Sequence, residues 1–265
     1  MKKIDNKKNL TLTIGWLYPD LMSTYGDRGN IICLRKRCEW RGIKVIVQPI
    51  TQDTAIEDIK KIDLLFGGGS QDIQQEIVMR DLKDKKGKII KEMIENDLPA
   101  LFVCGSPQLM GKYYEPAFGT RINGLGIFDM ISVNPGKDKP RCIGNIIASV
   151  NWENCNNPPN IKTVIVGFEN HGGRTYLGKS VKPFAKVLHG FGNNGEDGTE
   201  GVVYKNAVGC YFHGPFLPKN PQIADYFIKQ ALFKKYQANI QLSQLDEMLE
   251  VKARETVMDR YNFKT

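Results

Sequence analysis

The chain has 265 residues, of which 41% are hydrophobic and 25% are charged, and its formal net charge is +8 at pH 7. This is the composition of an ordinary globular protein. The basic residues show no interleaving with aromatic residues, so the charge does not indicate a nucleic-acid partner, and no run of about eighteen apolar residues predicts a membrane span.

Cysteine usage indicates a reduced, cytoplasmic protein. The six cysteines include no C-x-x-C pair, and the first eight residues are too polar for a signal peptide. The three histidines and the cysteines lack the spacing of metal ligands, so we expect no metal. The cysteines occupy positions 33, 38, 104, 142, 155 and 210.

The first half of the chain alternates predicted strands with predicted helices. Asn30 is the expected N-cap of the first helix and Gly42 its stop. Such alternation predicts an α/β fold with a mainly parallel sheet and helices on both faces. The predicted strands are 10–17, 43–50, 62–66 and 100–103, and the predicted helices are 31–41, 72–82 and 88–95.

The second half is richer in short strands and glycine turns, and several adjacent strands are expected to be antiparallel. We expect a domain over 11–236 and a C-terminal helical extension over 237–265. The predicted strands are 123–130, 141–150, 163–168, 187–188, 202–204 and 208–212, and the predicted helices are 220–236 and 245–262.

Cys104 directly follows the apolar strand 100–103, and the chain is helical in pattern from Gln108 onward. A sharp strand-to-helix turn would raise this side chain above the carboxyl edge of the sheet. The positive end of the helix would favour the reactive thiolate. Alternatively, Cys104 is simply a buried cysteine.

A second glycine-rich turn, 67–70, follows another predicted strand. Neither the P-loop pattern nor G-x-G-x-x-G is present. The backbone amides of Gly68 and Gly69, with that of Gly105, could instead stabilise an oxyanion beside Cys104. A plain tight turn would also explain the glycines.

A cysteine nucleophile needs a nearby base, usually histidine. His171 and His213 both lie at predicted strand ends, and spacing alone does not choose between them. His189, in Leu-His-Gly-Phe-Gly, has the pattern of an ordinary turn histidine.

Three segments together resemble the class I glutamine amidotransferases of the cobyric-acid-synthase type, which have a flavodoxin-like fold. Within that family the resemblance is strongest to the stand-alone glutaminase subunits of lipid II isoglutaminyl synthases, and it extends over 11–232. Each motif is weak alone, but their order and extent are specific. The segments are Val103-Cys-Gly-Ser-Pro-Gln-Leu-Met-Gly111, Gly167-Phe-Glu-Asn-His-Gly-Gly-Arg174 and Tyr211-Phe-His-Gly-Pro-Phe-Leu-Pro218.

The resemblance implies roles for three residues. Cys104 would attack the side-chain amide of glutamine, and His213 would serve as general base and then acid. Arg141 matches the substrate-binding arginine of the family, and its guanidinium could clamp the α-carboxylate of glutamine. Without the resemblance, Arg141 would be taken for a surface strand residue.

The resemblance also implies a partner. Ammonia would pass to a Mur-ligase-like synthetase subunit, forming a heterodimer, which amidates the D-glutamate α-carboxylate of lipid II for peptidoglycan synthesis. ATP and Mg²⁺ would belong to that subunit, with no cofactor in this chain, and contact with the membrane would be only indirect, through lipid II. The alternatives are a glutaminase for corrinoid-type amidation, a thiol peptidase or other amidase, and an inactive binding module.

One position departs from many class I enzymes, which carry a carboxylate two residues after the histidine. Here that residue is Pro215, so the acid that orients His213 is unidentified. Glu169, Glu200 or a partner subunit could supply it. We therefore expect the isolated chain to be a poor glutaminase.

Overall fold

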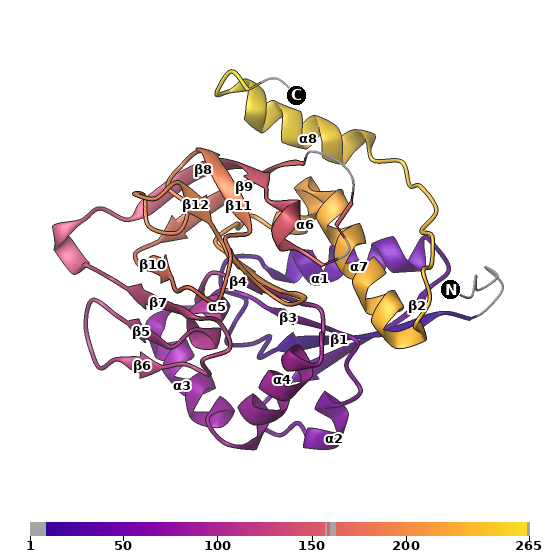
Figure 1. Cartoon of the computed structure of the whole chain (residues 1–265), viewed down its shortest axis with the longest axis horizontal. Helices are drawn as coiled ribbons and strands as arrows, with labels where there is room; N and C mark the ends of the chain where they lie inside the picture. Colours follow the sequence, from indigo (N-terminus) through magenta and orange to yellow (C-terminus); the bar gives the residue numbers. More distant parts are fainter. Residues whose placement is uncertain (1–8, 157, 160–162, 264–265) are drawn as a thin grey trace.

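A six-stranded sheet forms the centre of the computed structural model, which describes residues 9–156, 158–159 and 163–263 (Figure 1). Its strand order is β13-β14-β4-β3-β1-β2, and every neighbouring pair is parallel except β13 and β14. The mainly parallel α/β architecture predicted from the sequence is confirmed. The strands are β1 (Thr11–Leu17), β2 (Lys44–Ile50), β3 (Leu64–Gly67), β4 (Ala100–Val103), β13 (Val202–Tyr204) and β14 (Ala207–Cys210).

Helices cover both faces of this sheet (Figure 1). Alternate residues of β4 enter the two cores: Leu101 and Val103 pack with one helix group, and Ala100 and Phe102 with the other. Residues buried on both faces explain why such strands are continuous apolar runs. One group contains α1 (Arg28–Glu39), α6 (Phe216–Lys219) and α7 (Pro221–Tyr236); the other contains α2 (Ile56–Ile59), α3 (Asp72–Leu82), α4 (Lys85–Glu95) and α5 (Gly105–Met110).

Two smaller four-stranded sheets come from the stretch 113–200. One has the order β10-β7-β5-β6, and the other, β12-β11-β8-β9, is antiparallel throughout. Short single-turn helices occupy Gly136–Asp138 and Trp152–Asn154. The strands are β5 (Tyr113–Glu115), β6 (Ile122–Asn123), β7 (Met130–Val133), β8 (Cys142–Val150), β9 (Val164–His171), β10 (Arg174–Leu177), β11 (Ala185–His189) and β12 (Thr199–Glu200).

The prediction that Asn30 caps the first helix was wrong. Helix α1 begins at Arg28 with Asp27 at its N-cap position, so Asn30 is not the cap. Asn30 is buried within the helix, and its Oδ1 accepts a hydrogen bond from the Leu217 N–H, which ties α1 to α6. The tertiary contact therefore overrides the local capping preference.

The predicted strand 123–130 is mostly a loop between β6 and β7. Its backbone N–H groups donate to carbonyls at the end of α5 and just after it, instead of to a strand partner. A side chain at Gly124 would lie 2.2 Å from the Gly111 carbonyl oxygen, so this close approach requires glycine.

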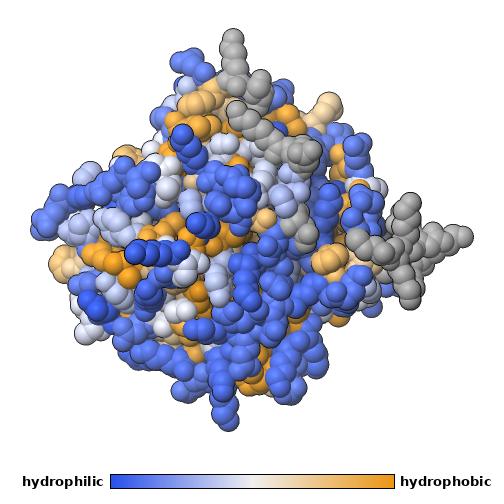
Figure 2. All heavy atoms as spheres, viewed as in Figure 1, coloured by the Kyte–Doolittle hydropathy of each residue, from blue (hydrophilic) through white to orange (hydrophobic). Residues whose placement is uncertain are grey.

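The C-terminal segment packs against the rest of the molecule. Helix α8 (Met248–Asp259) buries Met258 against β8 and β9, and the Tyr261 hydroxyl accepts a hydrogen bond from Asn145. No helix in the described ranges is long and apolar enough to cross a membrane. Figure 2 shows mostly hydrophilic residues on one face, with small scattered apolar areas.

A buried ion-pair cluster joins α1 to α7. Asp225 accepts paired hydrogen bonds from both Arg37 and Arg41, whose side chains are 2% and 4% exposed. Arg37 also contacts Glu247, just before α8. Removing one member of such a cluster leaves buried charge without its partner.

We predict that Asp225→Asn lowers the free energy of unfolding by about 3 kcal/mol, because Arg41 loses its carboxylate partner and Arg37 keeps only Glu247. Urea unfolding followed by circular dichroism measures this change. Asp58→Asn is the matched control, since the Asp58–Lys61 pair is exposed and its loss should change stability little. Equal effects of the two substitutions would contradict the prediction.

Candidate active site

Cys104 occupies the turn that joins β4 to α5. Its φ of 57° and ψ of −100° are unusual for a residue with a side chain, and this strain costs on the order of 1–3 kcal/mol. The Cys104 N–H donates to the Cys210 carbonyl at 2.8 Å, which extends the pairing of β4 with β14 by one residue. The predicted strand-to-helix turn is confirmed, although α5 begins at Gly105 and not at Gln108.

His213 lies three residues beyond the end of β14, and backbone hydrogen bonds in both directions with Phe168 of β9 fix its position. A methyl group at position 69 would lie 3.0 Å from His213 Cε1 and 3.1 Å from Cys104 Cβ. Gly69 is thus close to both residues, and the structure brings together the cysteine and one of the two histidines left open by spacing.

The charge state of His213 depends on two neighbours. Burial lowers the pKa of His213, but Cys104 and the Asp27 carboxylate beside the ring outweigh it and raise this pKa to about 10. His213 Nδ1 lies 3.5 Å from Asp27 Oδ1, and the Tyr25 ring lies 4.9 Å from the imidazole ring. The imidazolium form of His213 is therefore favoured at neutral pH.

The glycine-rich turn packs closely on this site. The Gly69 N–H donates to Asp27 Oδ2 at 2.7 Å and so is directed to that carboxylate. A side chain at Gly68 would lie 2.3 Å from the Met22 carbonyl oxygen and 2.9 Å from Asp27 Cβ. Close packing therefore accounts for these two glycines, and the predicted oxyanion role of Gly68, Gly69 and Gly105 stays a prediction.

A cavity of about 350 Å³ opens beside Cys104. Two side chains of opposite charge, Asp72 at the start of α3 and Arg141 just before β8, are among its lining residues. The cavity thus offers a positive and a negative group near the thiol. Its other lining residues are Tyr25, Ser70, Gln71, Gln75, Gln108, Tyr114, Asn134, Asn170, His171, Gly172 and Gly173.

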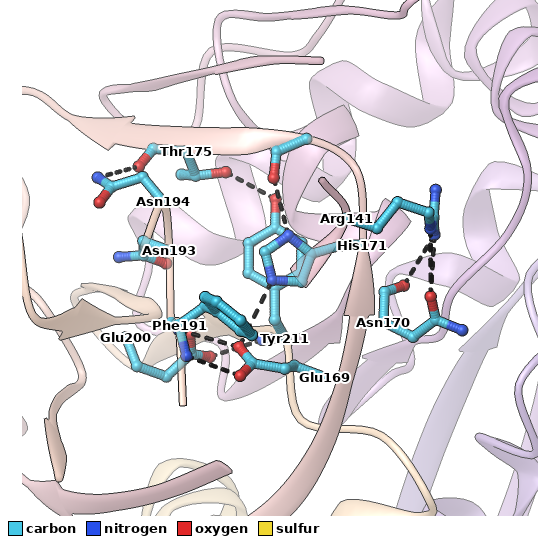
Figure 3. A network of polar contacts seen from close by, with 12 residues as sticks. Arg141, Glu169, Asn170, His171, Thr175, Phe191, Asn193, Asn194, Glu200 and Tyr211 are labelled. Carbon is cyan, nitrogen blue, oxygen red and sulfur yellow. Dashed lines mark hydrogen bonds and ion pairs between the residues drawn. The ribbon is translucent and has the colours of Figure 1, made fainter. Parts of the chain in front are cut away.

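Arg141 is held at the cavity by Asn170 of β9 (Figure 3). Its guanidinium donates to Asn170 Oδ1 at 3.1 Å and to the Asn170 carbonyl at 3.3 Å. The side chain stays exposed, so part of its donor set faces the solvent. This position suits recognition of a carboxylate that enters from outside.

His171, the other histidine left open by spacing, has different partners from His213 (Figure 3). Its ring stacks on Tyr211 with the centroids 3.9 Å apart, its Nδ1 lies 2.7 Å from the Gly173 carbonyl oxygen, and its Nε2 lies 3.8 Å from Glu169 Oε2. His171 and Gly173 line the cavity, whereas Tyr211 and Glu169 lie behind His171 and not among the lining residues. His189 stacks on Tyr261 instead, with the centroids 3.8 Å apart.

The two glutamates suggested as orienting acids bond elsewhere. Glu169 accepts hydrogen bonds from the Phe191 and Gly192 N–H groups, and Glu200 accepts one from the Tyr211 N–H. Over the described residues, the carboxylate paired with His213 belongs to Asp27.

Sequence reasoning missed Asp27, Tyr25 and Asp72. The first two lie just before α1, and an aspartate directly before a helix is the pattern of an N-cap. The only available signal was that all three residues lie within 11–232, the region of family resemblance.

Comparison with known proteins is consistent with this geometry. The family model "CobB/CobQ-like glutamine amidotransferase domain" matches residues 13–221. The chain is 40% identical to the lipid II isoglutaminyl synthase (glutamine-hydrolyzing) subunit GatD of Streptococcus pneumoniae, over 94% of this chain and 91% of that protein. It is 38% identical to the same-named Staphylococcus aureus protein, over 95% and 96%.

A solved glutamine amidotransferase structure shares the fold. Its TM-score is 0.56 at 14% sequence identity, and the match covers 82% of this chain and 98% of that one. At this identity the likeness concerns the fold alone.

We predict that Glu200→Gln changes the pH dependence of stability. Burial raises the pKa of Glu200 to about 8; the Tyr211 N–H lowers it in part, and the charge of Glu169 raises it further. The folded state then binds more protons than the unfolded one, so stability falls as pH rises from about 4.5 to 8. Urea unfolding measures the free energy of unfolding at each pH. The difference in this free energy, variant minus wild type, should increase by about 2–3 kcal/mol from pH 6 to pH 9. A pH-independent difference would contradict this.

Proposed function

The chain belongs to the CobB/CobQ-like glutamine amidotransferases, and from this premise we propose that it is the glutaminase subunit of a lipid II isoglutaminyl synthase. The observation that carries the proposal is the juxtaposition of Cys104 and His213 beside the cavity that Cys104 lines. The two GatD relatives support the acceptor, because each aligns over nearly its whole length.

The proposed reaction uses two groups of this chain. The Cys104 thiolate attacks the side-chain amide carbon of glutamine, and the His213 imidazolium gives its proton to the departing nitrogen, which leaves as ammonia. Neutral His213 then takes a proton from water as the water attacks the thioester. Glutamate leaves, and the thiolate with protonated His213 is restored.

Backbone amides at the two turns are proposed to stabilise the oxyanions of these steps. Gly105 follows Cys104 directly at the start of α5, and Gly68 lies in the neighbouring turn. Gly69 would contribute only if its N–H left Asp27 Oδ2.

Recognition of glutamine is proposed to use the two charged groups of the cavity. Arg141 would bind the α-carboxylate through parallel hydrogen bonds, and Asp72 would accept from the α-ammonium group. A zwitterion held at both charges would direct its side-chain amide toward Cys104.

Ammonia is proposed to pass to a Mur-ligase-like synthetase subunit in a heterodimer. That partner would bind ATP, Mg²⁺ and lipid II and amidate the D-glutamate α-carboxylate in the cytoplasm. The names of both relatives, which describe subunits of a synthase, support this division. We further propose that 11–236 is the amidotransferase domain and 237–265 an extension.

We predict that Cys104→Ala abolishes ammonia release from L-glutamine, because the sulfur atom that forms the thioester is removed. Release is measured by a coupled glutamate dehydrogenase assay, with the chain alone and with its synthetase partner. Cys155→Ala is the control, since Cys155 is a buried cysteine on another part of the core. Residual release equal to wild type would overturn the glutaminase proposal.

We predict that Arg141→Lys raises KM for glutamine about 10-fold and changes kcat less, because lysine cannot form two parallel hydrogen bonds to a carboxylate. Initial rates over a range of glutamine concentrations separate the two constants. A fall in kcat with KM unchanged would place Arg141 outside substrate recognition.

A further inference from the structure

We infer that Asp27 is the positioning residue that orients His213, in the place of the carboxylate that Pro215 does not provide. The inference rests on the proposed function, since it assigns a task in glutamine hydrolysis. Asp27 is far from His213 in sequence. It belongs to a segment that resembles an ordinary helix start.

The two carboxylate oxygens of Asp27 have separate partners. Oδ2 accepts the Gly69 N–H at 2.7 Å, whereas Oδ1 lies 3.5 Å from His213 Nδ1. Within the described part of the chain, Oδ1 and Nδ1 have no hydrogen bond, although both atoms are buried. Two buried, complementary atoms at this separation would pair after a shift of a few tenths of an ångström.

The position of Asp27 before α1 strengthens this interpretation. An aspartate there normally accepts a hydrogen bond from the first helical N–H groups. Asp27 makes no such capping bond, and its side chain is 0% exposed. Its carboxylate is thus directed away from its own helix and toward Gly69 and His213.

Packing explains how this distant residue reaches His213. A methyl group at Gly29 would lie 2.4 Å from Pro215 Cγ, so the first turn of α1 lies against the segment that follows His213. Likewise, Gly68 leaves room for Asp27, since a methyl group there would lie 2.9 Å from Asp27 Cβ. The two glycines permit the approach of three chain segments at one point.

The charged and titratable groups around His213 leave Asp27 as its acid. Glu200 interacts with His213 through its charge, but it bonds to the Tyr211 N–H and has a raised pKa of about 8, and Glu169 lies against His171. The other titratable groups near His213 are Cys104 after β4, Tyr25 before α1, and Lys219 on α6, whose Nζ would lie 3.5 Å from a methyl group at Gly214.

The chemical consequence follows from the two ring nitrogens. With the Nδ1 proton held by Asp27, the imidazole keeps Nε2 as the atom that exchanges a proton with Cys104 and the leaving amine. The carboxylate also stabilises the imidazolium form. Asp27 also accepts a hydrogen bond from the Gly69 N–H, so one carboxylate contacts both the glycine-rich turn and His213.

Asp27→Asn is the test, carried out on the full chain alone and with its synthetase partner. Asparagine is similar in size and can still accept from Gly69, but it places no negative charge at Nδ1. We expect kcat for glutamine hydrolysis to fall about 10²-fold, with KM within about 2-fold of wild type.

We also expect Asp27→Asn to lower the pKa of His213 in an NMR titration of the three histidines, whose resonances are assigned with His→Gln variants. Glu169→Gln is the control for that titration, and it should leave the His213 resonance unmoved.

A second measurement requires no change at position 27. In the wild-type chain, the Nδ1 proton of His213 should give a far-downfield resonance that is lost in His213→Gln. If this resonance is absent, or if Asp27→Asn folds and leaves both kcat and the His213 titration unchanged, the inference is overturned.

The outcomes also separate this inference from the proposed function. Loss of ammonia release in Cys104→Ala together with full activity of Asp27→Asn would retain the glutaminase and reject Asp27, leaving the acid to the partner. A shifted His213 titration in Asp27→Asn, in a chain that releases no ammonia from glutamine under any condition, would reject the glutaminase while upholding the pairing of Asp27 with His213.

Discussion

The parallel pairing of β3, β4 and β14 is the constraint on which the site depends. Parallel strands bring their carboxyl ends to one edge, so the segments that follow them meet there. The register aligns Gly67 with Phe102 and Cys210 with Val103, and this places the glycine turn and the His213 segment on either side of Cys104. The strained backbone of Cys104 is tolerated because its N–H continues the ladder to Cys210. A side chain is thereby presented at the edge without any break in the sheet.

Burial makes the charges at this edge effective. Asp27 and His213 are almost fully excluded from solvent, so their attraction is screened far less than that of a surface pair. The same burial would penalise an isolated charge, and the imidazolium of His213 is favoured because the Asp27 carboxylate lies beside it. Gly68 and Gly69 leave the space in which three chain segments can approach this closely.

The sequence was sufficient to predict an element where short-range contacts or a periodic apolar pattern define it. Residues 72–82 and 100–103 were predicted with their observed bounds, because apolar periodicity and an uninterrupted apolar run define them. It was insufficient where a distant contact decides. Asn30 is a residue type that often caps helices, but its side chain accepts a hydrogen bond from the Leu217 N–H instead. Likewise, the N–H groups of the loop before β7 donate to carbonyls at the end of α5. Asp27 was missed for the same reason. His213, the residue beside which it lies, is far along the chain, and no local sequence pattern predicts that the two are close in space.

The site divides into a buried half, which holds the proposed reactive groups, and an exposed half, which holds the proposed recognition group Arg141. Cys104, His213 and Asp27 are held by the central sheet and by α1, so their geometry follows from the folding of this chain. Arg141 is exposed at the mouth of the cavity and is anchored mainly by Asn170. An exposed arginine side chain is readily moved by a molecule that binds beside it, whereas the buried side chains of Asp27 and His213 are not. Because the carboxylate beside His213 belongs to this chain, we expect a partner that alters turnover to act on the exposed Arg141 side of the cavity more directly than on His213.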